Sequence, residues 1–241
     1  MAFTTNPRLA RGGVAVGEYD EGLRSYMLSV FNYMGLGLVI TGLVAYVVGT
    51  NPALYMPIFG SPLKWVVMLA PLGFVFFLGA RMTSMSVSAA QITFWAFAAV
   101  MGLSMASIFL VFTGESIART FFITAATFGA VSLYGYTTKA DLTKFGSFLF
   151  MGLIGIVIAS LVNIFLASSA LQFAISVIGV LVFTGLTAYD TQRIKEEYLS
   201  FAGSSGSEMI AKGAIMGALS LYLDFINLFT MLLQFFGSQR D

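Results

Sequence analysis

Seven apolar stretches, each long enough to cross a bilayer as a helix, constrain the fold of this chain more than any other feature of its sequence. A hydrocarbon core about 30 Å thick requires about 20 consecutive, mostly apolar residues of helix. Short polar joints separate the stretches, so the pattern predicts an all-α membrane protein built as a seven-transmembrane helix bundle. The expected spans are roughly Tyr26 to Val48, Leu63 to Ala80, Ala89 to Phe112, Thr120 to Tyr136, Phe145 to Ala167, Leu171 to Tyr189 and Gly213 to Phe236.

The composition of the chain supports a membrane protein and removes several classes of chemistry. Of the 241 residues, 58% are hydrophobic and 10% are charged, whereas a soluble domain is about a quarter charged. The net charge of +1 argues against a nucleic-acid partner. The absence of cysteine excludes disulfides, thiolate metal sites and thiol catalysis. Because histidine is also absent, a pH response near neutrality has to come from carboxylates.

The chain divides into a polar tail at residues 1–24, a transmembrane domain at 25–237 and a short C-terminal tail at 238–241. The first 24 residues contain no apolar segment of the signal-peptide type, so we expect the first span to direct insertion. The fourth expected span is the shortest, and six spans with one re-entrant segment are the alternative. Six spans would move the C-terminus to the other side of the membrane.

The distribution of Lys and Arg on alternate sides of the spans predicts the orientation, because excess positive charge stays in the cytoplasm. Nine such residues fall on the side of the N-terminus and three on the other side. We therefore expect a cytoplasmic N-terminus and, with seven spans, a C-terminus across the membrane. The nine are Arg8, Arg11, Arg24, Arg81, Lys139, Lys144, Arg193, Lys195 and Lys212, and the three are Lys64, Arg119 and Arg240.

Asp224 is the most informative single residue, because it lies deep within the last apolar stretch, in LSLYLDFINLF. A carboxylate at the centre of a bilayer costs about 2.5–3.5 kcal/mol on insertion scales unless it is paired or hydrated. Intramembrane ionisable groups of this kind are usually functional. A neutral, hydrogen-bonded structural aspartate is the alternative interpretation.

Asp190 and Arg81 are the two charged groups that could accompany Asp224. Asp190 ends the sixth expected span, and if the helix continues through Arg193 and Ile194 it faces the bundle and can meet Asp224, provided that the helices tilt. An aspartate in the headgroup region is the alternative. Arg81 ends the second span, where it is either a positive-inside anchor or the counter-ion of a membrane carboxylate.

Two carboxylates in one poorly hydrated site would form a proton-sensitive device without histidine. They cannot both ionise cheaply, so they exchange protons as a unit. Together with backbone carbonyls and water, Asp190 and Asp224 could also bind Ca²⁺ weakly and transiently, which suits conduction better than storage. Asn227 and Thr187, each one turn from an aspartate, could hydrogen bond into the site or simply join neighbouring helices. We expect no permanent cofactor.

Five segments occur in the order and at the positions found in one family: YMLSVFNYM, LGARMTSMS, YTTKADLTKFGSFL, LTAYDTQRI and GALSLYLDFINLF. Together they cover nearly the whole chain and resemble the Bax inhibitor 1 family. The resemblance implies a bacterial inner-membrane protein in which the last of seven helices is central and carries a pH-sensitive calcium leak. By motif position, it implies Asp190 and Asp224 as paired sensors and Arg81 as a latch. The joint between the aspartates, with GSSGSE inserted, is longer than in the simplest members.

Two functions remain open at this point. The first is a cation leak, preferring Ca²⁺, which is closed while ionised Asp190 is held by Arg81 and opens when protonation or cation binding weakens that contact. Longer bacterial relatives also resemble partners of a membrane-bound ATP-dependent protease, so a non-enzymatic modulator that binds through the N-terminal tail is the alternative. Deleting residues 1–20 would separate the two, because a leak needs only the helical bundle.

We expect that the chain is not an enzyme. It has no histidine for a catalytic triad, no phosphate-binding glycine loop and no His or Cys metal ligands. An intramembrane aspartyl protease would need its second aspartate in a Gly-x-Gly-Asp turn. Here Asp224 instead follows Leu221, Tyr222 and Leu223.

Overall fold

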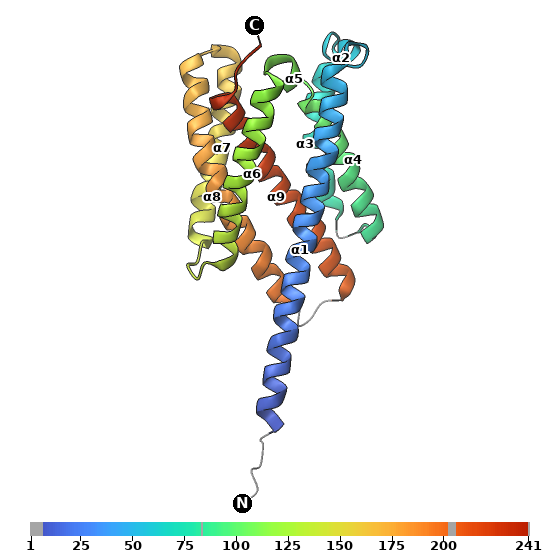
Figure 1. Cartoon of the computed structure of the whole chain (residues 1–241), viewed down its shortest axis with the longest axis vertical. Helices are drawn as coiled ribbons and strands as arrows, with labels where there is room; N and C mark the ends of the chain where they lie inside the picture. Colours follow the sequence, from blue (N-terminus) through green and yellow to red (C-terminus); the bar gives the residue numbers. More distant parts are fainter. Residues whose placement is uncertain (1–6, 83, 202–205, 241) are drawn as a thin grey trace, which may run out of the picture.

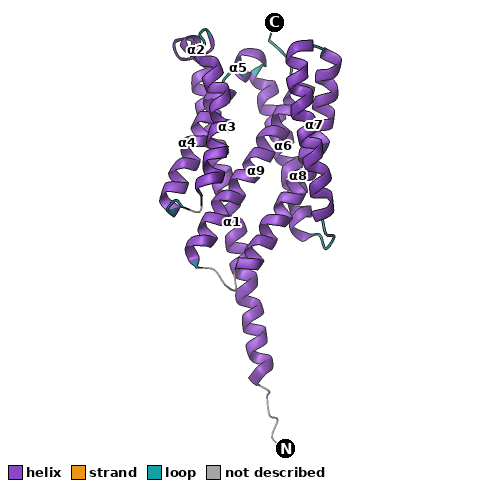
Figure 2. Ribbon diagram, turned by 180° about the vertical axis from the view of Figure 1, so that it is seen from behind, coloured by secondary structure: helices purple, strands orange, loops and turns teal. Residues whose placement is uncertain are grey.

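The computed structural model describes residues 7–82, 84–201 and 206–240, and the side chains of these residues except 7–20 and 201. Part of the GSSGSE joint and the first residues of the N-terminal tail therefore lie outside the described residues. The described chain is helical, with short loops (Figure 2). Its helices are α1 (Pro7–Thr50), α2 (Pro52–Phe59), α3 (Leu63–Arg81), α4 (Val87–Met105), α5 (Ile108–Val111), α6 (Gly114–Thr137), α7 (Thr143–Leu166), α8 (Ser169–Phe201) and α9 (Ser207–Phe236) (Figure 1).

Seven of these helical stretches are long and apolar enough to cross a membrane, which confirms the predicted number of spans. The stretch that contains the fourth expected span, Gly114–Thr137, has 24 residues and is long enough to cross the membrane completely. The alternative of six spans with one re-entrant segment is therefore not needed. Several helices extend beyond the predicted limits, because their terminal turns carry polar residues that a search for apolar runs leaves out. The start of α1 and the end of α9 lie at opposite ends of the molecule, as an odd number of spans requires (Figure 1).

Side-chain caps mark where several helices begin. The Oδ1 atom of Asn51 accepts a hydrogen bond of 3.0 Å from the backbone N–H of Ala53, so α2 starts immediately after α1 ends. The Ser86 Oγ atom accepts from Ala89 N at the start of α4. Each cap binds an amide that would otherwise lack a partner in the first turn of a helix. The polar residues of the joints therefore fix the places where the chain turns back into the membrane.

Helix α9 is the centre of the bundle, as the resemblance implied. It packs against α8, α1, α6 and α4. In its most apolar 18-residue window, 72% of the residues are buried, against 6% for α7. Small residues allow this approach, since Gly217 of α9 packs against the side chain of Ile194 of α8. Residues on α9 are consequently held in place by contacts on several sides.

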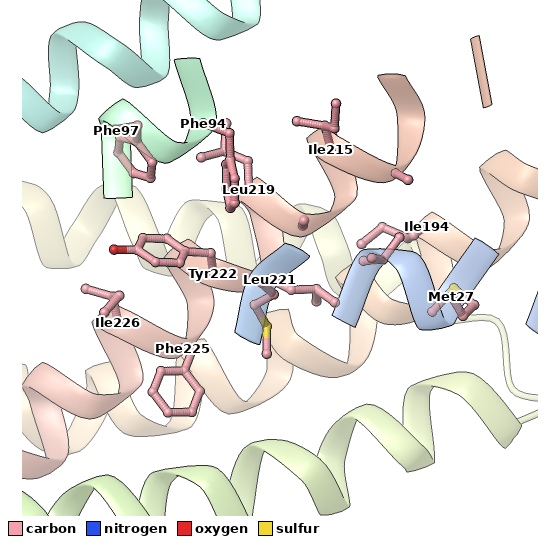
Figure 3. Close-up of a cluster of buried hydrophobic side chains, with 14 of the residues drawn as sticks. Met27, Phe94, Phe97, Ile194, Ile215, Leu219, Leu221, Tyr222, Phe225 and Ile226 are labelled. Carbon is pink, nitrogen blue, oxygen red and sulfur yellow. The ribbon is translucent and has the colours of Figure 1, made fainter. Parts of the chain in front are cut away.

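A buried tyrosine fixes the rotation of α9 against α1 and α4. Tyr222 is completely buried, and its ring lies 5.3 Å from the ring of Phe97 and 6.1 Å from that of Phe94 (Figure 3). Its hydroxyl lies 2.6 Å from Thr41 Oγ1 of α1, which also donates to the carbonyl of Ala98 on α4. This polar contact inside an apolar cluster specifies one orientation of α9. The residue two positions later, Asp224, is then directed to a different face of the helix.

The contact between α6 and α8 gives the first testable prediction. A Cβ atom added at Gly135 would overlap the backbone of Ala188, whereas one added at Gly129, on the same helix, would meet nothing within 4 Å. Gly135→Ala should therefore destabilise the bundle by about 1–3 kcal/mol, the usual cost of overpacking. Gly129→Ala should be neutral or stabilising by up to about 1 kcal/mol, through helix propensity. Thermal unfolding in detergent measures both; equal effects would show that α6 and α8 do not approach at Gly135.

Candidate functional site

The structure brings Asp190 of α8 and Asp224 of α9 together. Helix α8 continues through Arg193 and Ile194 to Phe201, which is the condition under which Asp190 was expected to face the bundle. The side chain of Asp190 is 14% exposed and Asp224 is 5% exposed. Both side chains line the same cavity, and their carboxyl groups are close enough to interact electrostatically. The Oδ2 atom of Asp224 is buried and has no partner among the described residues.

Asp190 and Asp224 lie at different distances from the joint between α8 and α9, and the tilt between these two helices brings them together. Asp190 lies roughly three turns before the end of α8, and Asp224 lies roughly five turns after the start of α9. In parallel straight helices, that difference would separate the two carboxyl groups. The two helices are inclined to one another in both views (Figures 1 and 2), which closes the gap.

Arg193 is the cation that accompanies the acid pair. Its Nη2 atom lies 3.1 Å from Asp190 Oδ1 and donates a hydrogen bond of 3.2 Å to Ser220 Oγ on α9. Its Nε atom lies 4.0 Å from Glu197 Oε1, and its guanidinium carbon lies 5.9 Å from the centre of the Tyr189 ring. One side chain therefore joins Asp190 to the helix that carries Asp224.

The sequence interpretation missed Arg193, although a signal for it was present. Arg193 follows Asp190 by three positions, and residues three apart lie on the same face of a helix. Ser220 stands one turn before Asp224 in the same way. Arg193 was counted only as a cytoplasmic charge, because local pairs at helix ends are usually solvated.

The structure does not bring Arg81 to the acid pair. Arg81 is exposed at the end of α3, a helix that packs against α2 and α4. No ion pair within 4 Å joins it to any described residue. A charged residue at the end of a span reaches only the neighbours of its own helix, and α3 lies on the other side of α9 from α7 (Figure 1). The latch role of Arg81 therefore stays a prediction, and in this structure Arg193 occupies the place expected for it.

Thr187 and Asn227 donate hydrogen bonds to their own helices. Thr187 Oγ1 donates to the carbonyl of Phe183 at 2.7 Å, and Asn227 Nδ2 donates to that of Leu223 at 2.8 Å. Thr187 is fully buried, whereas Asn227 lines the same cavity as the two aspartates. Asn227 is therefore the better placed of the two to contact an ion or water beside Asp224.

A cavity of about 570 Å³ opens onto the acid pair between α7, α8 and α9. Helix α7 approaches α8 closely here, because a Cβ at Gly146 would lie 2.5 Å from the Tyr189 ring. The space is large enough for several water molecules, and polar groups line one side of it. Its lining residues are Gly146, Ser147, Phe150 and Leu153 of α7, Phe183, Leu186, Tyr189, Asp190 and Arg193 of α8, and Ser220, Leu223, Asp224 and Asn227 of α9.

The interface of the same three helices changes character along its length. From the cavity onward it becomes an apolar belt, which shares Phe183 and Leu186 with the cavity lining, and beyond the belt it ends in a cluster of amides and a hydroxyl. In that outer cluster, Gln172 donates to Gln234, Ser176 donates to Gln234 at 3.1 Å, and Asn163 donates to Gln172 at 3.1 Å. The buried members of the belt are Leu149, Ile156, Ile175, Val182, Phe183, Leu186, Leu228 and Leu232.

The acid pair offers only part of a cation site. Among the described residues, no group of three or more His, Cys, Asp or Glu side chains could hold a metal. Ca²⁺ takes six to eight oxygen ligands, so two aspartates would leave most of its shell to water and amide or hydroxyl oxygens. Such a site would release its ion readily.

Fold and site together define a multi-pass α-helical membrane protein whose central helix contributes one member of a buried acid pair, Asp224, and whose α8 contributes the other, Asp190. A family model described as "Inhibitor of apoptosis-promoting Bax1" matches residues 23–241. The chain therefore belongs to the Bax inhibitor 1 family.

Three bacterial relatives cover most of the chain. A protein of Rickettsia prowazekii is 50% identical over 92% of this chain and 93% of its own length. One of Caulobacter vibrioides is 48% identical over 92% of each chain. The inner membrane protein YbhL of Escherichia coli K12 is 47% identical over 91% of this chain and 94% of its own. With seven spans and such a relative, the chain is a multi-pass protein of the inner membrane.

Measurements of stability can distinguish Arg193 from Arg81 as the counter-ion of the acid pair. Arg193→Gln removes the contacts to Asp190 and Ser220, so we expect a loss of about 1 kcal/mol, at the low end for charged hydrogen bonds because 39% of the Arg193 side chain is exposed. Arg81→Gln should change stability by less than about 0.5 kcal/mol. Thermal unfolding in detergent at neutral pH measures both. A larger loss for Arg81→Gln would place the counter-ion in α3.

Proposed function

We propose that this protein is a pH-sensitive cation leak of the inner membrane, with a preference for Ca²⁺, gated by Asp190 and Asp224. The observation that carries the proposal is the acid pair beside a cavity at one end of the α7–α8–α9 interface, with a second polar cluster at the other end. A path for a hydrated ion needs polar groups at both mouths, and it closes where apolar side chains exclude water. The apolar belt between the two clusters is suited to that closed position.

In this proposal, the ion pair between Asp190 and Arg193 holds the path closed. While Asp190 is ionised, Arg193 binds it and also donates to Ser220, so α8 and α9 stay joined. Protonation or cation binding at the acid pair removes the charge that Arg193 holds. The joint between the helices then weakens and the open population increases. Flux should therefore rise as the pH falls.

Replacing Asp224 by Asn tests the sensor directly. In liposomes that contain the purified chain, wild-type Ca²⁺ flux should vary with pH by about 5- to 150-fold, the usual range of coupling between two sites. Asp224→Asn leaves Asp190 without the neighbour that shares its proton, so the flux should lose this pH dependence or shift it to a different pH. A fluorescent Ca²⁺ indicator inside the liposomes, read between about pH 5 and pH 8, measures it.

Asp141→Asn is the matched control, because Asp141 lies outside the spans in the exposed joint between α6 and α7. Hydrogen bonds from Thr143 hold the pKa of Asp141 below its ordinary value of 3.8, so this carboxylate stays ionised throughout the measured range. Its replacement should leave the pH profile unchanged. An unaltered profile in Asp224→Asn, or a lost one in Asp141→Asn, would contradict the proposal.

The apolar belt gives a second test with its own control. Leu228 and Leu221 are both fully buried leucines of α9, but Leu228 belongs to the belt against α7 and α8, whereas Leu221 belongs to the cluster against the other helices. Leu228→Ser should hydrate the belt and raise Ca²⁺ flux at neutral pH. Leu221→Ser should leave flux near the wild-type level, although both lose similar packing. Equal flux in the two variants would place the closed position elsewhere.

A second candidate function is non-enzymatic modulation of a membrane-bound ATP-dependent protease. The feature that favours it is the first part of α1, which extends from the bundle at the N-terminal end (Figure 1). Such a projecting helix is accessible to a partner, and the predicted orientation places it in the cytoplasm. Deletion of residues 1–20 tests this function. If the deletion abolishes an effect on the protease but leaves Ca²⁺ flux unchanged, modulation of the protease is favoured over the leak.

A further inference from the structure

Helices α1 and α6 stand apart from each other and leave α9 visible between them (Figure 1). Two cavities lie along this opening. One, of about 400 Å³, is lined by apolar side chains that include Phe121 of α6 and Phe225 of α9. The other, of about 320 Å³, lies at the N-terminal end of the span and is formed by α1 and α6 alone. Neither cavity contains Asp190 or Asp224, so the opening is separate from the site described above.

The walls of the N-terminal cavity are apolar and face the bilayer. Leu28 of α1 is 52% exposed and Leu133 of α6 is 62% exposed, and both belong to membrane-spanning stretches. Phe31 completes the α1 side. Inside this lining, Ser132 is 3% exposed and its Oγ atom has no hydrogen-bond partner among the described residues. The cavity thus combines a hydrocarbon-like surface with one buried hydroxyl that lacks a partner.

Cations stand at the mouth of the same cavity. Arg24 lies in the first turns of the span that begins at Glu21, is exposed, and forms no ion pair within 4 Å with any described residue. On the α6 side, Lys195 Nζ donates to the carbonyl of Tyr136 at 2.8 Å and lies 5.2 Å from the centre of the Tyr136 ring, which lines the cavity. One positive charge therefore lines the cavity, and a second lies against Tyr136 in the cavity wall.

We propose that this cavity binds an anionic phospholipid, with the phosphate beside Arg24 and an acyl chain between α1 and α6. An apolar cavity that opens into hydrocarbon is filled by acyl chains rather than water, since it lacks polar partners for water. Cations at the end of a span attract anionic headgroups, and basic pockets between transmembrane helices bind them. The lipid comes from the leaflet on the side of the N-terminus, which we predict to be cytoplasmic.

Native mass spectrometry of the full chain in neutral detergent tests the proposal, with phosphatidylglycerol and phosphatidylcholine of identical acyl chains as probes. The wild type should retain phosphatidylglycerol in preference to phosphatidylcholine. Arg24→Gln should weaken phosphatidylglycerol binding about fivefold, the effect of one cation near a membrane surface. Lys64→Gln removes a positive charge at the start of α3, outside the cavity, and should bind as the wild type does.

A second variant tests the position of the acyl chain. Gly129 lines the cavity and has nothing within 4 Å of an added Cβ, so Gly129→Leu introduces its side chain at an open position of the cavity wall. It should reduce retention of both lipids while leaving thermal unfolding near that of the wild type. Equal retention of the two lipids by the wild type, or unchanged binding in Arg24→Gln, would overturn the proposal. So would unchanged binding in folded Gly129→Leu.

Discussion

The constraint on which the rest of the structure depends is the carboxyl group of Asp224 within the most buried helix of a membrane protein. A charged or polar group at that depth needs a partner or water, because hydrocarbon offers neither. The bundle offers partners and space for water at one interface. Asp190 and Arg193 approach from α8, and a cavity lies between α8, α9 and α7. The opposite side of α9, where Tyr222 contacts Thr41, Phe94 and Phe97, is closely packed. The central helix thus has one closely packed side and one side that faces a cavity.

In the proposed leak, this asymmetry would direct the effect of a local proton exchange to one side of the bundle. The packed side of α9 fixes its rotation against α1 and α4, so motion is easier where α7 and α8 meet the cavity. Helix α7 is mostly exposed to the bilayer and packs against α8, so it can move without breaking the central cluster. Conformational changes that alter few packed contacts need the least free energy. The proposed leak uses that part of the molecule.

Much of this architecture could be predicted from the sequence, because bilayer thickness imposes a length on each apolar stretch. The seven spans and the central position of α9 followed from this rule and from the family resemblance. The cost of burying a carboxylate singled out Asp224 and, with the continued helix, Asp190. The counter-ion was harder to identify, because Arg81 and Arg193 both stand near the end of a span. The spacing of Asp190 and Arg193 indicates that they share a helix face. Only the packing of α8, rather than α3, beside α9 shows which arginine lies close to both aspartates.

The central claim is that Asp190 and Asp224 exchange protons as one unit. Infrared difference spectroscopy of the reconstituted chain, between about pH 5 and pH 8, measures the carboxyl signal directly. The account predicts that either Asp190→Asn or Asp224→Asn alone removes or shifts the whole pH-dependent signal of the pair, because the remaining carboxyl has lost its coupled neighbour. If each variant instead keeps about half of the wild-type signal at an unchanged pH, the two carboxyls are independent and the account is contradicted.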